Sequence, residues 1–262
     1  MKLASLLHFG FALAILVLFA SNSFGLRIEP VPVKPLTIDG IKYTAPFDDP
    51  YVEKLQARDE KTDKLLWVID LHRNPPNEGL SGGGIFLKEL RSFRNNLIAE
   101  DEAERCFMVD LKTKAVTRTV RFRPFRIEDY QAFPKNWDEK TTPVLAVRMQ
   151  SEFDWKQYFG AAGVMRKNKP YAPPPETFEK EEILFAAVIA DTAKNEAIEL
   201  EGIVLDEKLH TITVSFSSPV PTGKKATAGA KFKNVAGCFM AKAPDAKVIF
   251  LHNGKEVSPP AK

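Results

Sequence analysis

One strip of the sequence alternates arginine with aromatic residues, a pattern that can bind sugars, anionic polymers or single-stranded nucleic acid. It spans residues 118–126, RTVRFRPFR, and its candidate binding residues are Arg121, Phe122, Arg123, Phe125 and Arg126. The same alternation is typical of an amphipathic edge strand. The net charge of +3, from 37 basic and 34 acidic side chains, is too even for a nucleic-acid-binding face. The strip therefore predicts a binding surface or an edge strand, and no nucleic-acid partner.

A glycine-rich segment, residues 79–84, is the second candidate site. Backbone N–H groups of Gly82, Gly83 and Gly84 could converge on an anion. A phosphate loop would continue into a helix that begins with Lys-Ser or Lys-Thr, whereas the strand-like IFLKEL follows here. The alternative is a plain connection between strands.

Carboxylates offer a third kind of chemistry. Asp59, Glu100 or Asp101 could serve an envelope enzyme of hydrolase type, provided that two of them share a pocket. The acidic cluster at residues 99–105 lacks the spacing of a calcium loop and favours a solvated turn. The sequence has neither a Gly-x-Ser-x-Gly nor a His-Glu-x-x-His motif. We therefore identify no catalytic set and expect no cofactor.

Histidines and cysteines offer little for a metal. His72, His210 and His252 have no second ligand at metal spacing, so we interpret them as structural residues. Cys106 and Cys238 belong to no Cys-x-x-Cys pair. They predict either two buried thiols or a disulfide that clamps two domains outside the cytosol.

The N-terminus has the layout of a secretory signal peptide over residues 1–25. A basic Lys2 precedes a long apolar run, and small residues at Ser23 and Gly25 fit a cut near Gly25. The alternative is an uncleaved membrane anchor, although the apolar centre is short for a span and no basic cluster follows it. We expect a secreted or periplasmic protein without an integral membrane span after cleavage.

The rest of the chain predicts a mainly β protein with two small antiparallel domains and one short helix in the second. Residues 26–50 are proline-rich and predict an extended arm. Residues 51–123 alternate as five or six strands of a meander. Residues 124–143 suggest a linker, and residues 144–262 form the second domain. In that domain EFDWKQYFGAAGVM predicts the helix, EILFAAVIADT a strand covered on both faces, and residues 221–237 a long irregular connection.

The stretch ARDEKTDKLLW resembles the hairpin of pyrroloquinoline-quinone-type propeller blades. The matching residues are Ala57, Asp59, Thr62, Lys64 and Trp67. Asp63 occupies the usual glycine position, and aspartate also adopts the left-handed conformation of such a turn. Residues 109–116 repeat the pattern more faintly, but a propeller needs at least four blades. The resemblance therefore implies a hairpin and no cofactor, and we interpret Trp67 as a core residue of the first domain.

The second half, about residues 144–257, resembles the PrcB family of secreted, protease-associated domains. The order of features carries this resemblance: a strand, the aromatic helix with FDWKQYF, the buried strand after TFEKEE, a hairpin, and CFMAKAPDAKVIF. The family is non-catalytic, and its founding member accompanies a secreted protease. The chain lacks the family's Lys-Pro-Thr-Gly-Gly-Tyr type of stretch and has ADTAKNEA at residues 190–197 instead.

Together these features predict a secreted or periplasmic, non-catalytic binding or accessory protein. Its partner would be another secreted protein, a protease among the candidates, or an envelope polymer. The alternatives are the envelope enzyme with a carboxylate site, and a structural module of a secreted assembly.

Overall fold

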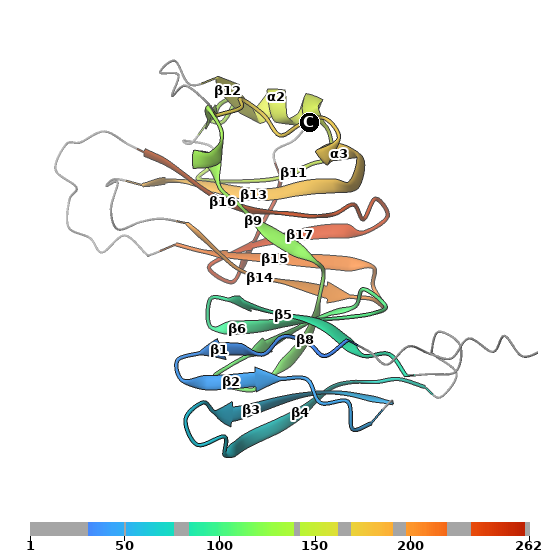
Figure 1. Cartoon of the computed structure of the whole chain (residues 1–262). Helices are drawn as coiled ribbons and strands as arrows, with labels where there is room; N and C mark the ends of the chain where they lie inside the picture. Colours follow the sequence, from blue (N-terminus) through green and yellow to red (C-terminus); the bar gives the residue numbers. More distant parts are fainter. Residues whose placement is uncertain are drawn as a thin grey trace, which may run out of the picture. The chain divides into compact units, whose positions relative to one another are not determined.

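The computed structural model describes residues 31–49, 51–75, 84–138, 142–161, 169–190, 198–218 and 232–259. Strands dominate these residues and form several mostly antiparallel sheets (Figure 1), which confirms the mainly β class. The described residues hold two short α-helices, α2 (Glu152–Tyr158) and α3 (Thr177–Lys180), one more than the sequence predicted. Neither helix is long and apolar enough to cross a membrane. The predicted signal peptide lies outside the described residues.

The chain divides into two compact units. Unit 1 holds the described residues up to Ser92 together with Asp101–Ala103, and unit 2 holds Phe93–Glu100 and the described residues from Glu104 onward. The division runs through a sheet of order β5-β6-β7-β8. Its strands are β5 (Leu87–Phe93), β6 (Asn96–Asp101), β7 (Cys106–Asp110) and β8 (Val116–Thr119).

Unit 1 contains a four-stranded antiparallel meander in which each strand pairs with the next. Its strands are β1 (Leu36–Ile38), β2 (Ile41–Thr44), β3 (Val52–Asp59) and β4 (Leu65–Arg73). The first two lie in the segment that the sequence suggested as an extended arm. They pair because Asp39 and Gly40 both adopt positive φ, 51° and 75°, and so make a two-residue hairpin turn. The prolines that exclude a helix precede this hairpin.

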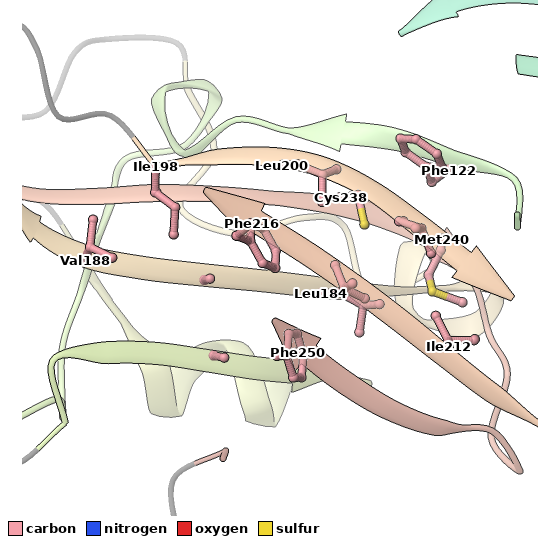
Figure 2. Packing of buried hydrophobic residues seen from close by; sticks show 14 of the residues in the cluster. Phe122, Leu184, Val188, Ile198, Leu200, Ile212, Phe216, Cys238, Met240 and Phe250 are labelled. Atoms are coloured by element: carbon pink, nitrogen blue, oxygen red, sulfur yellow. The ribbon is translucent and has the colours of Figure 1, made fainter. Parts of the chain in front are cut away.

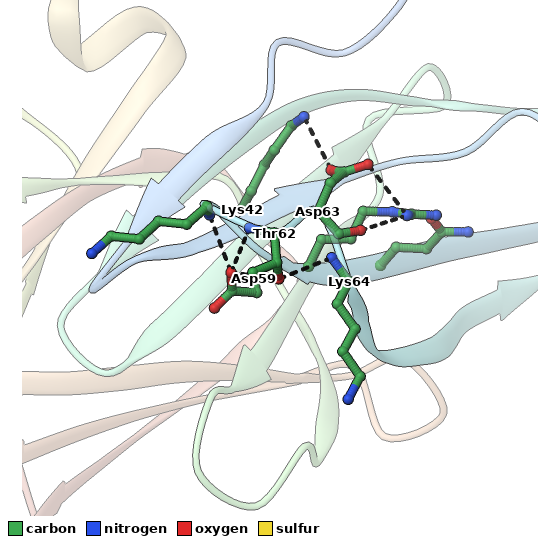
Figure 3. A network of polar contacts seen from close by, with 8 residues as sticks. Lys42, Asp59, Thr62, Asp63 and Lys64 are labelled. Atoms are coloured by element: carbon green, nitrogen blue, oxygen red, sulfur yellow. Dashed lines mark hydrogen bonds and ion pairs between the residues drawn. The ribbon is translucent and has the colours of Figure 1, made fainter.

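The β3–β4 hairpin turns as the sequence predicted, with Asp63 in the left-handed region at φ 53°. Figure 3 shows how Asp59 fixes the turn. One carboxylate oxygen accepts hydrogen bonds from the backbone N–H of Lys61 at 3.1 Å and from the N–H and hydroxyl of Thr62, both at 2.7 Å. The side chain therefore replaces the backbone partners that the turn leaves unpaired.

The β7–β8 hairpin has the same turn. Asp110 accepts from the N–H groups of Lys112 at 2.8 Å and Thr113 at 2.6 Å, and Lys114 takes the left-handed position at φ 67°. The faint sequence repeat thus corresponds to a repeated local geometry.

Unit 2 contains two further four-stranded sheets. One has the order β11-β13-β16-β9 and the other β14-β15-β17-β18. The first comprises β9 (Phe122–Phe125), β11 (Val144–Met149), β13 (Glu181–Ala190) and β16 (Phe232–Ala241). The second comprises β14 (Glu199–Asp206), β15 (Thr211–Ser217), β17 (Lys247–His252) and β18 (Lys255–Val257). The β15–β17 pair is parallel, because the chain passes through β16 in the other sheet before it returns.

The β11-β13-β16-β9 sheet is covered on both faces, as the continuous apolar run of β13 predicted. On one face Leu184 and Met240 join Ile212, Phe216 and Phe250 of the second sheet in a single core (Figure 2). On the other face Phe185 and Phe239 meet an aromatic cluster that contains Trp155 of α2. Figure 1 shows the resulting order of layers within unit 2: α2, then the β13 sheet, then the β15 sheet.

The segment that the sequence suggested as a linker is part of this architecture. Residues 124–143 include the end of β9, the 3-10 helix η2 (Ile127–Asp129) and β10 (Ala132–Pro134), which pairs with β12 (Phe159–Ala161). Trp137 is 7% exposed and belongs to the aromatic core. Burial of Phe125 and Trp137 fixes the segment to unit 2, so the chain's compact units divide near Ser92 instead.

The irregular connection predicted at residues 221–237 is also shorter than expected. β16 begins at Phe232 and pairs with all ten residues of β13, from Glu181 opposite Ala241 to Ala190 opposite Phe232. The long partner strand therefore extends the pairing into a segment whose composition, rich in glycine, alanine and threonine, favoured a loop.

Candidate binding site

Within the arginine-aromatic strip, Phe122–Phe125 form β9, an edge strand that pairs with β16 over Gly237–Met240. Phe122 and Phe125 are 3% and 4% exposed. Their spacing of three residues places them on opposite faces of the sheet, one in each hydrophobic core. The two phenylalanines therefore stabilise the fold, and Phe125 also lines the pocket described below.

The arginines of the strip have separate surroundings. Arg123 donates to Glu181 at 2.7 and 3.2 Å, and its guanidinium lies 3.7 Å from the centroid of the Phe239 ring. Arg121 lies 3.4 Å from Glu100. By contrast, the exposed guanidinium of Arg126 forms no hydrogen bond or ion pair with the part of the chain that the structure describes.

Arg126 lies at a pocket of about 410 Å³ within unit 2. The pocket is bounded by the β5–β6 turn, the end of β9, the start of β14 and part of β16. Its apolar lining comes from Phe93, Phe125, Ile198, Leu200 and Val235. Its charged lining comes from Arg94, Arg126, Glu128 and Glu199.

Arg94 is held in place at this pocket. Its guanidinium donates to the carbonyl oxygen of Leu200 at 2.9 Å, pairs with Glu201 at 2.9 Å, and hydrogen-bonds Glu199. The positive charge of Arg94 is therefore compensated by two carboxylates. Among the charged groups of the lining, Arg126 remains the cation without such a partner among the described residues.

The described strands cover the edge of β16 at the pocket only in part. β9 pairs with β16 from Gly237 onward and turns away into η2 after Phe125. Val235 and Ala236 precede that paired region and line the pocket. Because alternate residues of a strand direct their N–H and C=O groups to each side, this part of β16 presents backbone hydrogen-bonding groups beyond the end of β9.

Of the other candidate residues, those that the structure describes do not line this pocket. Gly82 and Gly83 fall outside the described residues, and Gly84 is buried. Asp59 is engaged in its turn, where hydrogen bonds from Thr62 lower its pKa. Glu100 and Asp101 are 1% and 0% exposed in β6, and successive residues of a strand point to opposite faces. None of these three acids lines the pocket.

The histidines do not gather into a metal site in the described part of the chain. His72 lies in β4, and His210 takes the left-handed position of the β14–β15 turn at φ 48°. The Nε2 atom of His252 lies 2.8 Å from the Ser218 hydroxyl, and burial lowers the pKa of this histidine. The structural interpretation of the three histidines stays a prediction.

Both cysteines are free and buried, which confirms the first of the two sequence interpretations. Burial raises the pKa of the Cys238 thiol well above its usual range. A hydrogen bond with the backbone of Leu184 lowers this pKa in part, and the charge of Glu182 raises it further. A thiol that stays protonated is a poor nucleophile, so Cys238 packs as a small apolar residue.

No family model matches the chain, and no curated protein matches it. The likenesses to a propeller-type hairpin and to the PrcB family are therefore carried by the sequence patterns alone.

Sequence reasoning missed most of the pocket. Arg94, Glu199 and Val235 belong to three different elements, and each lies in an ordinary strand or turn pattern. Arg126 and Phe125 are the pocket residues that a local signal, the alternation of arginine with aromatics, brought forward.

Proposed function

We propose that this chain is a non-catalytic binding or accessory protein and that its pocket holds an extended segment of a protein partner. The observation that carries the proposal is the edge of β16 at Val235 and Ala236, which no strand of the described residues pairs on the β9 side and which lies beside an apolar lining. A strand edge that faces a pocket favours a peptide backbone, because main-chain hydrogen bonds supply affinity while side-chain pockets supply specificity.

Charge favours one acidic group on the ligand. The guanidinium of Arg126 has no carboxylate among the described residues, and an arginine pairs strongly with a carboxylate. Glu128 and Glu199 also line the pocket, and Glu199 is already engaged by Arg94. Two carboxylates beside the site oppose a polyanion, so a protein segment with a single acid fits better than an anionic envelope polymer.

The cellular setting of the proposal rests on the sequence. A signal peptide at residues 1–25 supports export, and the likeness to the PrcB family supports an accessory role beside another secreted protein such as a protease. The enzyme alternative receives less support, because Asp59, Glu100 and Asp101 do not line the pocket.

A hexapeptide array incubated with the purified protein tests the proposal. We expect retention of peptides rich in β-branched residues that carry one Asp or Glu. Arg126→Glu should reverse the preference of the protein from acidic to basic peptides. It should also weaken the binding of acidic peptides about tenfold or more, since a charge-assisted hydrogen bond contributes roughly 1.5–3 kcal/mol. Lys208→Glu is the matched control, because it makes the same charge change at an exposed turn away from the pocket.

A second experiment, with modified peptides, tests whether the bound peptide pairs with β16. A retained peptide is resynthesised with N-methyl groups at alternate backbone positions, in the two possible phases. One phase should abolish binding in titration calorimetry and the other should leave it, because an added strand uses every second N–H on one side. An array without retained peptides, or equal profiles for Arg126→Glu and Lys208→Glu, would overturn the proposal.

A further inference from the structure

β9 and the pocket occupy the same edge of β16, one after the other. The antiparallel pairing of β9 with β16 ends where Phe125 lies opposite Gly237. Val235 and Ala236 come directly before Gly237 in β16 and line the pocket. A strand added at these two residues therefore lies in line with β9, because each edge of a strand has room for one neighbour at about 4.8 Å. Such a strand cannot continue past the end of β9.

The end of β9 is followed at once by Arg126. The backbone of Arg126 is still extended, at φ −120° and ψ 115°, and η2 begins at the next residue. A guest strand that reaches this point must either turn out of the sheet or end there. The pocket volume of about 410 Å³ is near the lower end of the range of roughly 300–1,000 Å³ for ligand sites. The site therefore favours the end of a peptide chain, which needs no turn, over the middle of a long strand.

The charge at this point distinguishes the two ends of a peptide. The exposed guanidinium of Arg126 lines the pocket and forms no hydrogen bond or ion pair within the described residues. A second cation lies nearby, since the ammonium of Lys169 donates to the carbonyl oxygen of Glu128. A C-terminal carboxylate gains a charge-assisted hydrogen bond from Arg126, whereas these cations repel an N-terminal ammonium. Glu128, the acid that would attract an ammonium, lies in η2, after the chain has left the sheet.

We propose that the pocket captures the C-terminus of an extended protein segment, which runs parallel to β16 and ends at Arg126. This inference rests on the proposed function and identifies its single acidic group as the terminal carboxylate. An Asp or Glu side chain in a peptide with a blocked C-terminus would imitate that group. The direction is parallel because β16 runs toward Gly237, the end at which Arg126 lies. Successive residues of a strand point to opposite faces, so one of the last two side chains of the segment reaches the apolar lining.

Paired arrays of hexapeptides test the inference. Both arrays carry the same sequences of valine, isoleucine, threonine and serine, so that no side chain is acidic. In the first array the peptides are tethered through the N-terminus and end in a free carboxylate. In the second they are tethered through the C-terminus as an amide and have an acetylated N-terminus. We expect the purified full chain to bind the first array only, with a preference for valine or isoleucine at one of the last two positions.

Titration calorimetry with one retained peptide tests whether Arg126 binds the carboxylate. Amidation of the peptide's C-terminus should weaken binding about tenfold or more, since a charge-assisted hydrogen bond is lost. Arg126→Gln should weaken binding of the free acid by a similar factor and leave binding of the amide unchanged, because both changes remove the same interaction. Lys208→Gln is the matched control at an exposed turn away from the pocket, and it should alter neither affinity.

Failure of this inference differs from failure of the proposed function. Equal retention on the two arrays, or a loss on amidation that Arg126→Gln leaves unchanged, would overturn C-terminal capture while peptide binding itself stands. The same conclusion follows if the acid-containing hexapeptides of the earlier array are retained and those with a free C-terminus are not. An absence of retention on every array would overturn the inference together with the proposed function.

Discussion

The guanidinium of Arg148 on β11 donates to the carboxylate of Glu182 on β13 at 2.9 Å, and Glu182 has 0% of its surface exposed. The same carboxylate oxygen accepts from the side-chain amide of Gln150 at 3.0 Å. The two terminal nitrogens of Arg148 donate to the carbonyl oxygens of Ala243 at 2.5 Å and Ala246 at 2.8 Å. One arginine therefore joins two neighbouring strands to the turn that leads into β17.

Removal of the arginine should be strongly destabilising. Arg148→Met leaves the Glu182 carboxylate buried without its cation, and breaking a buried pair from one side costs about 3–5 kcal/mol. Urea unfolding followed by tryptophan fluorescence measures the change. The control is Arg148→Met/Glu182→Leu, which removes both charges and should recover most of the lost free energy of unfolding. Equal loss in the single and double variants would contradict this account of the pair.

A side chain at Gly237 should not fit the central sheet. A Cβ atom there would lie 2.5 Å from the carbonyl oxygen of Leu184 and 2.8 Å from the Cβ of Phe185. Backbone cannot yield as a flexible side chain does, so Gly237→Ala should lower the free energy of unfolding by about 1–3 kcal/mol. Thermal and urea unfolding give the measurement.

Gly202→Ala is the matched comparison, because Gly202 also lies in a strand of unit 2. A Cβ atom there would meet the terminal Cε of Met108 at 3.0 Å, and the end of a methionine side chain can shift. The cost should therefore be clearly smaller than at Gly237. Equal costs at the two positions would show that close approach to the backbone is not what excludes a side chain at Gly237.

The turn at Asp59 should be sensitive to acid. The hydroxyl and backbone N–H of Thr62 hold the pKa of Asp59 below its ordinary value by bonding the charged form. A depressed native pKa stabilises the folded chain above the pKa of the unfolded state, and this stabilisation is lost as the pH falls through the native pKa. Thr62→Val should raise the pKa of Asp59, as followed by the carboxyl ¹³C chemical shift during an acid titration.

Asp110 provides an internal repeat of that experiment. Hydrogen bonds from Thr113 lower the pKa of Asp110 in the same way, so Thr113→Val should raise the pKa of Asp110 and leave that of Asp59 unchanged. A Thr62→Val variant whose Asp59 keeps its low pKa would rule out the threonine as the main cause.

Local sequence patterns predicted the strands well. β4 occupies Leu65–Arg73, the run that β-forming residues and the preceding turn indicated, and β13 is a central strand, as its unbroken apolar run indicated. The left-handed conformation of Asp63 also followed from the sequence, because a hairpin turn of this type restricts that position to a few residue types. Such features depend on neighbours within a few residues, which the sequence states directly.

The sequence did not predict the burial of Trp67 correctly. The sequence predicted a core residue, but the side chain is only partly buried and lies against Tyr43, with ring centroids 5.7 Å apart. β4 is an edge strand, so fewer neighbours can cover its side chains. A strand's own sequence shows which residues share a face and does not show how completely that face is covered.

The sequence by itself determined the mainly β class, most strand positions and the chemistry of individual turns. Only the tertiary structure decided that β9 pairs with β16, that the suggested linker belongs to unit 2, and that Arg126 meets Leu200 and Val235 at one pocket. The reason is that hydrophobic burial rewards any apolar face equally, so a strand pattern does not specify its partner. The partner is selected by the combined burial and hydrogen bonding of segments far apart in the chain.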